Sequence, residues 1–259
     1  MRAIENPDVV EHLSWDEVAA RIAKGAAAIL PIGAGAKQHG FHLPMNTDRL
    51  QAEALAAGIS AHVDALIWPT VTYGYYPAFT AYAGSASLSG ETFEHIVEEL
   101  TRSFVSYGCK AVLVLDTGIS TIAPVDRALS RVGSARTLHL KIHDGRRYKL
   151  AAQKIAQQRL GSHADELETS LMLALAPDMV AMLRAQASQA IKREVPGSLT
   201  PSDSSSPNYS LSGSFGDPTL ATLEKGKILL EAMTDDLIEQ ARSFATGAVV
   251  TTSRSGRAS

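Results

Sequence analysis

The sequence has little of several features that mark specialised classes of protein. Among its 259 residues Cys109 is the only cysteine, which excludes an intrachain disulfide framework and favours a reducing compartment. Neither charge sign is in excess, because the formal net charge is −3, so no basic surface for nucleic acid is expected. Cys109 precedes an apolar run and is interpreted as a buried core residue.

Long hydrophobic runs are also lacking. No apolar run is long enough to span a membrane, and residues 1–15 lack the apolar stretch of a signal peptide. We therefore expect a soluble, cytoplasmic protein without membrane or nucleic-acid partners. The hydrophobic content of 45% is enough for one large domain with a sizeable core.

Two common phosphate-binding motifs are incomplete. Gly33 and Gly35 begin a dinucleotide-type pattern, but Gln38 stands where the third glycine would be. No Gly-Lys-Ser/Thr triplet follows, so the turn is not a P-loop either.

Apolar runs alternate with helical patterns along the chain. Strands are predicted at residues 28–32, 65–69, 110–115 and 137–142. Helices are predicted at 15–24, 49–58, 91–107 and 121–132, a helix or flap at 148–160, and a last helix that ends near residue 244. This alternation predicts an α/β domain with a mainly parallel sheet, in which the continuous apolar run 110–115 is a central strand.

The first predicted strand leads into a loop rich in chemically useful side chains. Lys37, His39, His42 and Asp48 follow the glycine turn within one short stretch. Such loops at the carboxyl ends of strands commonly carry ligand sites, and imidazole and carboxylate groups are good ligands for divalent metals. Asp48 alone would be explained equally well as the cap of the next helix.

This loop resembles that of the creatininase family of metal-dependent amidohydrolases, which reads LPxGSxEQHGxHLPxxTD. The match includes Leu30, Pro31, Gly33, Gln38, His39, Gly40, His42, Leu43, Pro44, Thr47 and Asp48. One position departs from the family pattern, since Lys37 stands where the family has a metal-binding glutamate.

Three further blocks, in family order, carry the same resemblance. Residues 69–93 resemble PxxxYGxxxxHxxFPGTxSLSPETF without its central histidine, residues 163–175 match HAGxxETSxMLAL, and residues 216–226 resemble GDPxxAxxEKG. The resemblance implies a three-layer α/β/α creatininase-like domain over residues 1–245, commonly assembled as a hexamer. Residues 198–214 are predicted to be a loop or linker, and residues 246–259 a mobile tail.

The resemblance also implies two metals, and the departures affect only one of them. Lys37 replaces the glutamate and Gly118 replaces the histidine of one ligand set, whereas His39, Asp48 and Glu168, the ligands of the other, are retained. We hypothesise that Lys37 takes the place of the first metal. At most one divalent metal then remains, either zinc, manganese or iron, and a metal-free protein is the alternative.

The candidate catalytic residues are Lys37, His163 and Asp165, of which the last two are predicted to transfer protons. The candidate substrate-binding residues are His42, Tyr73, Tyr76, Asp116 and Ser120. The loop containing the tyrosines is predicted to line a pocket or to pack between subunits. His139 and His143 are interpreted as structural or exposed.

Three functions remain open on this basis. The first is a hydrolase or related lyase acting on a small cyclic amide or another non-peptide C–N bond. The second is a metal-independent isomerase, cyclase or lyase that uses Lys37 in the same pocket. The third is a non-catalytic binding or assembly subunit, which the retained polar residues disfavour.

Overall fold

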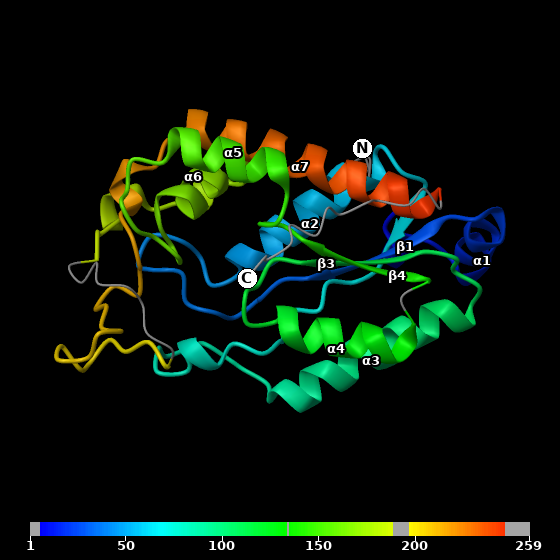
Figure 1. Ribbon diagram of the computed structural model, residues 1–259, viewed down its shortest axis with the longest axis horizontal. Coiled ribbons are helices and arrows are strands. Elements are labelled where there is room, and N and C mark those ends of the chain that lie inside the picture. The colour runs from blue at the N-terminus through cyan, green and yellow to red at the C-terminus, as the bar shows by residue number, and fades with distance from the viewer. Residues whose placement is uncertain (1–5, 134, 189–196, 247–259) are drawn as a thin grey trace, which may run out of the picture.

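The protein is described here by a computed structural model, in which residues 6–133, 135–188 and 197–246 are placed. Its sheet has four parallel strands in the order β2-β1-β3-β4 (Figure 1). The strands are β1 (Ala27–Ile32), β2 (Ala65–Ile67), β3 (Val112–Asp116) and β4 (Thr137–Lys141). The predicted α/β class and parallel sheet are confirmed.

Helices cover both faces of the sheet, as Figure 1 shows. One face carries α3 (Gly90–Ser106) and α4 (Ile122–Val132), and the other carries α2 (Thr47–Ser60), α5 (Arg146–Ile155), α6 (Glu166–Leu175) and α7 (Leu223–Ala245). The first helix, α1 (Trp15–Lys24), begins at a Ser14/Glu17 capping box. The segment 148–160, predicted to be a helix or a flap, is largely the helix α5.

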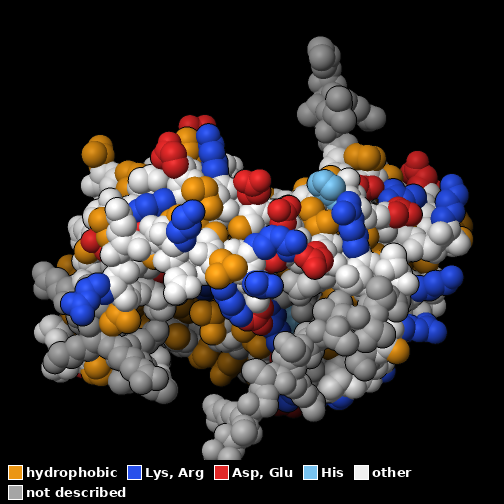
Figure 2. All heavy atoms as spheres, turned by 45° about the horizontal axis from the view of Figure 1, so that its top comes forward, with side chains coloured by type: hydrophobic (Ala, Val, Ile, Leu, Met, Phe, Trp, Pro, Cys, Tyr) orange, Lys and Arg blue, Asp and Glu red, His pale blue; other side chains and the backbone are white. Residues whose placement is uncertain are grey.

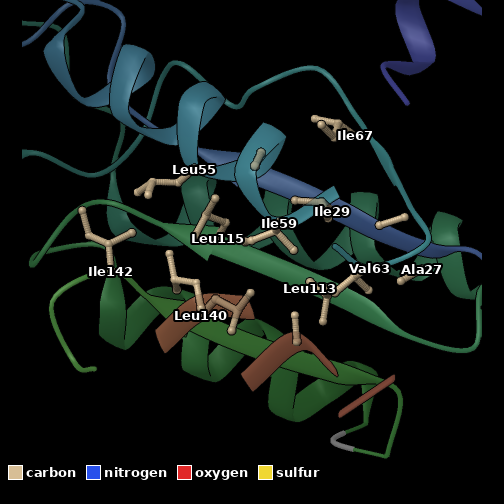
Figure 3. Close-up of a cluster of buried hydrophobic side chains, with 14 of the residues drawn as sticks. Ala27, Ile29, Leu55, Ile59, Val63, Ile67, Leu113, Leu115, Leu140 and Ile142 are labelled. Atoms are coloured by element: carbon tan, nitrogen blue, oxygen red, sulfur yellow. The ribbon is translucent and has the colours of Figure 1, made fainter. Parts of the chain in front are cut away.

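Alternate residues of the central strands explain the two helical layers. Ile29, Leu113 and Leu115 pack against α2 and α7 in one buried cluster, drawn in Figure 3. Leu30 and Val114 point the other way, into a cluster with α3 and α4. Strands buried on both faces need apolar residues at every position, which is the origin of the continuous apolar runs.

The parallel register brings the carboxyl ends of β1, β3 and β4 to one edge. Ile32 pairs with Asp116, and Asp116 pairs with Lys141. The loops that leave these strands therefore lie together. Gly33 lets the first loop return close to α2, because a Cβ there would lie 2.5 Å from the Asp48 carbonyl oxygen.

The segment 198–214 forms no helix or strand, as predicted, but it is fixed to the body of the protein. Tyr82 Oη donates to the Ser210 carbonyl oxygen at 2.7 Å, and Gln38 Nε2 donates to that of Gly213 at 3.0 Å. It is therefore a packed loop rather than a free linker. Residues 247–259 lie outside the described residues, so the mobile tail remains a prediction.

Three other features bear on the expectations from composition. Within the described ranges, every helix is too short or too polar to cross a membrane. On the face seen in Figure 2, Lys and Arg side chains lie among Asp and Glu side chains, without an expanse of either sign. Cys109 is buried, which confirms its interpretation as a core residue.

Candidate active site

A cavity of about 380 Å³ lies where the loops after β1, β3 and β4 meet α6. Lys37 and Asp48 border it from the first loop and α2, and residues 117–120 border it from the loop after β3. His143 borders it from the loop after β4, and Glu168 from α6. The cavity thus occupies the place in the sheet where the sequence predicts a ligand site.

Lys37 and Asp48 form a buried ion pair at this cavity. The Lys37 Nζ atom lies 2.7 Å from Asp48 Oδ2, and their side chains are 8% and 3% exposed. The Nζ atom also lies 4.9 Å from the centre of the Phe79 ring. Burial opposes ionisation of Asp48, but the Lys37 ammonium and the His39 ring outweigh it and hold the pKa of this carboxyl well below its usual range.

His39 is oriented by the backbone of its own loop. Its Nδ1 atom donates to the Lys37 carbonyl oxygen at 2.8 Å, which leaves Nε2 facing two carboxylates. Asp48 Oδ1 lies 2.9 Å from Nε2 and Glu168 Oε1 lies 3.7 Å from it. An unprotonated Nε2 would repel both oxygens, so this nitrogen either carries a proton or faces a cation.

His163 shows the same arrangement from another part of the chain. Its Nε2 atom donates to the Gln38 carbonyl oxygen at 2.8 Å, and its Nδ1 atom lies 3.7 Å from Glu168 Oε2. Burial lowers the pKa of His163 to about 3, so the ring is neutral and Nδ1 keeps its lone pair. A hydrogen bond from the second ring nitrogen to a backbone carbonyl is the usual support of a metal-ligating histidine.

Glu168 closes this group from the first turn of α6. Its Oε2 atom accepts from the Ala164 amide at 2.6 Å, and Ala164 adopts a left-handed φ of 45°. Burial raises the pKa of Glu168, but nearby positive charge, at His39 and at the Lys37 ammonium, outweighs it, and the pKa lies below its usual range. The carboxyl is therefore ionised and available to a cation.

The ligand atoms of His39, His163 and Glu168 all lie within 4.8 Å of one another. Two imidazole nitrogens and one carboxylate suit zinc, manganese or iron, so the residues present fit one divalent ion. This group differs from the predicted set of His39, Asp48 and Glu168. His163 joins it, while Asp48 lies beside it, paired with Lys37.

Asp165 has a structural role in the protein. It is the N-cap of α6, and its Oδ1 atom accepts from the amides of Leu167 and Glu168 at 2.9 and 3.0 Å. Gln158 Nε2 donates to its other oxygen at 2.8 Å. The helix therefore starts after Asp165, and His163 precedes the cap.

The predicted substrate-binding residues separate into two groups. Tyr76 and Ser120 border the cavity, although Ser120 Oγ is engaged in donating to the Tyr75 carbonyl oxygen at 2.7 Å. Tyr73, His42 and Asp116 are not among the residues that border it. Tyr73 is 57% exposed, so its predicted place in the pocket is not borne out by the geometry.

His42 and Asp116 are buried, and their side chains hydrogen-bond to neighbouring segments. His42 Nε2 is hydrogen-bonded with Thr169 Oγ1 at 2.7 Å, which ties the first loop to α6. Asp116 Oδ1 accepts from the Gly118 amide at 2.9 Å and from Thr121 Oγ1 at 2.7 Å. Asp116 Oδ2 lies 3.2 Å from His139 Nε2, so His139 is structural, as predicted.

Sequence reasoning missed His143, Phe79 and Tyr148, which also border the cavity. His143 is exposed, as one of its two interpretations from the sequence states, and it also borders the cavity, which the sequence analysis did not predict. Its position directly after β4 was the available signal, since other site residues also follow strands.

Known proteins resemble the chain over most of its length. It is 26% identical over 255 residues to creatinine amidohydrolase of Pseudomonas putida, covering 90% of this chain and 95% of that protein. It is 29% identical over 224 residues to the mycofactocin precursor peptide peptidase of Mycobacterium tuberculosis, covering 82% and 83%.

Solved structures agree with these relatives. A creatininase described with Mn has a TM-score of 0.78 and 26% identity, covering 91% of this chain and 98% of that one. Another creatininase structure is described as Zn-Zn type. The sequence model of the creatininase family, described as creatinine amidohydrolase, matches residues 11–241, and the chain therefore belongs to the creatininase family.

Proposed function

We propose that this protein is an amidohydrolase that uses one divalent metal to cleave a small cyclic amide or a related C–N bond. The observation that carries the proposal is the paired orientation of His39 and His163. In each ring one nitrogen donates a hydrogen bond to a backbone carbonyl, and the other nitrogen faces Glu168. His39, His163 and Glu168 would hold the ion, which when bound supplies Lewis-acid polarisation of the amide carbonyl.

Lys37 provides the second positive charge of this site. Its ammonium is fixed 2.7 Å from Asp48 Oδ2 at the edge of the cavity, where it can stabilise negative charge that develops on substrate oxygen. A free nucleophilic amine would first have to leave this buried ion pair. The arrangement therefore favours an electrostatic role over covalent catalysis by Lys37.

The cavity limits the substrate to a small group. About 380 Å³ is near the lower end of the usual range for small-molecule sites, and Phe79, Leu171 and Leu229 provide apolar walls. These dimensions favour a small ring over a long peptide. Because one relative is a peptide peptidase, a terminal peptide bond is the alternative to test beside cyclic amides.

The experiment combines metal analysis with an activity screen. Purified protein is stripped with a chelator, reloaded separately with zinc, manganese and iron, and assayed on creatinine, hydantoin, 2-pyrrolidinone and short peptides. We expect about one tightly held ion per chain and metal-dependent cleavage of a cyclic amide. His163→Ala and Glu168→Ala should lose the ion, whereas His95→Ala, on an exposed position of α3, should retain it.

A metal-independent isomerase, cyclase or lyase is the second candidate. It is favoured by the contact between His39 Nε2 and Asp48 Oδ1 at 2.9 Å, since a protonated His39 beside Lys37 would provide two positive charges without an ion. Failure of the wild-type protein to hold any of the three metals would overturn the metal-dependent proposal and support this one.

A further inference from the structure

We propose that His143 transfers the proton between water and the leaving nitrogen during the proposed hydrolysis. The proposal rests on the proposed function and assigns one of its steps to a residue in the loop after β4. His143 lies between β4 (Thr137–Lys141) and α5 (Arg146–Ile155) and borders the same cavity as Lys37 and Glu168.

The other imidazoles of the site are already engaged. His39 is fully buried and does not border the cavity. His163 borders it, but one ring nitrogen donates to the Gln38 carbonyl oxygen and the other faces Glu168. If His163 holds the ion, it has no nitrogen left with which to exchange a proton.

His143 has both ring nitrogens available. Neither makes a hydrogen bond or an ion pair with any residue in the described ranges, and the ring contacts Tyr148 at 5.4 Å between centroids. The side chain is exposed and borders the cavity. An imidazole that faces a ligand cavity and is unpartnered on both nitrogens is suited to proton transfer.

The charges around His143 keep it able to accept a proton. Desolvation by the surrounding protein atoms lowers its pKa, an effect that Lys37 reinforces and the carboxylates of Glu168, Asp48 and Asp116 oppose. Tyr148 faces the ring from α5. The net lowering leaves the imidazole neutral at pH 7, in the form that a general base requires.

The step balances without any additional reactant. Water forms a bond from its oxygen to the amide carbon, and its proton passes to one nitrogen of His143. The C–N bond then breaks, and His143 returns this proton to the leaving nitrogen. With a cyclic amide the product is one ring-opened molecule that carries both a carboxylic acid and an amine, and His143 regains its initial state.

The test compares His143→Gln and His143→Ala with Asp144→Asn, on metal-loaded protein and the cyclic amide cleaved fastest by the wild type. Asp144 belongs to the same loop, but its side chain pairs with Lys149 at 3.1 Å outside the cavity. We expect His143→Gln to lower kcat about 100-fold or more, with little change in KM or metal content. Asp144→Asn should keep wild-type kcat.

Two further readouts separate proton transfer from a structural role. Added imidazole should restore part of the activity of His143→Ala in a saturable way, because the vacated space opens to the cavity. The acidic limb of the pH profile of kcat should disappear in His143→Gln. A kcat within twofold of wild type in His143→Gln, or no rescue of His143→Ala by imidazole, would overturn this inference alone.

A different result would overturn the proposed hydrolysis itself. If metal-loaded wild type cleaves none of the cyclic amides and peptides, the proposed hydrolysis fails, and the role of His143 fails with it. The two failures are distinguishable, because the first is seen in the wild-type protein and the second only in the His143 variants.

Discussion

Replacing Lys37 with methionine tests whether its ammonium compensates a buried charge. The Lys37 and Asp48 side chains are 8% and 3% exposed, with 2.7 Å between Nζ and Oδ2. Methionine keeps an unbranched, apolar side chain beside the Phe79 and Tyr76 rings, so packing changes little. The variant therefore removes mainly the charge.

The expected loss of stability follows from the burial of Asp48. Removing one partner of a buried ion pair costs about 3–5 kcal/mol, because the other charge is left uncompensated. The lower end applies here, since Asp48 Oδ1 still lies 2.9 Å from His39 Nε2. A loss of about 3 kcal/mol corresponds to a fall of roughly 6–12 °C in Tm for a domain of this size.

The effect should also depend on pH. The folded-state pKa of Asp48 is lowered, so its contribution to stability is present above the unfolded pKa near 3.9 and is lost as the pH falls through the folded value. Without Lys37 this contribution shrinks. The stability difference between variant and wild type should thus persist from neutral pH down to about pH 4 and decrease only at lower pH.

Urea denaturation in the presence of a chelator measures the stability difference and its pH dependence, at about pH 7 and about pH 3. Lys149→Met is the matched control, because the Lys149 and Asp144 side chains are 57% and 61% exposed, and such pairs contribute little. If the unfolding free energy of Lys37→Met at pH 7 lies within about 0.5 kcal/mol of the wild-type value, a difference typical of surface substitutions, Lys37 does not compensate a buried charge.

Three other substitutions test separate parts of the structure. Asp165→Ala removes the α6 cap and should lower the unfolding free energy by about 1 kcal/mol in urea denaturation; an unchanged midpoint would contradict the capping role. Tyr76→Phe removes a buried hydroxyl without a hydrogen-bond partner among the described residues, so Tm should not fall while KM for the cyclic amide rises; an unchanged KM would exclude contact with substrate. Gly226→Ala places a Cβ 1.8 Å from the Ser170 carbonyl oxygen and should cost roughly 1–3 kcal/mol through overpacking of α6 against α7; a calorimetric Tm equal to wild type would refute this close approach.

The fold could be predicted because its signals are local or periodic. Residues 112–116 are all buried, so a strand between two helical layers appears in the sequence as an unbroken apolar run. The helix starts at Ser14 and Ser89 follow from capping rules that involve residues three positions apart. The motif around His39 then identified the site loop.

The finer geometry of the site depends on contacts between distant segments. His163 is oriented by the Gln38 carbonyl oxygen, 125 residues earlier in the chain, so its sequence position could not separate a metal ligand from a proton donor. Asp165 caps α6 and also borders the cavity, so its role in proton transfer stays a prediction. His143 became visible only when the order of the strands placed its loop beside the others.

Lys37 and Gly118, which stand at the two departures from the family pattern, are closely packed against their neighbours. The Lys37 Nζ atom is held between Asp48 and the Phe79 ring, and a Cβ at Gly118 would lie 2.4 Å from Thr121 Oγ1. That hydroxyl is itself engaged, since it donates to the buried Asp116 carboxyl at 2.7 Å. A histidine at position 118 therefore needs a smaller residue at position 121 and a new donor for Asp116. Random loss of one ligand would not require these matched neighbours, and this packing supports the proposal that the protein uses a single metal.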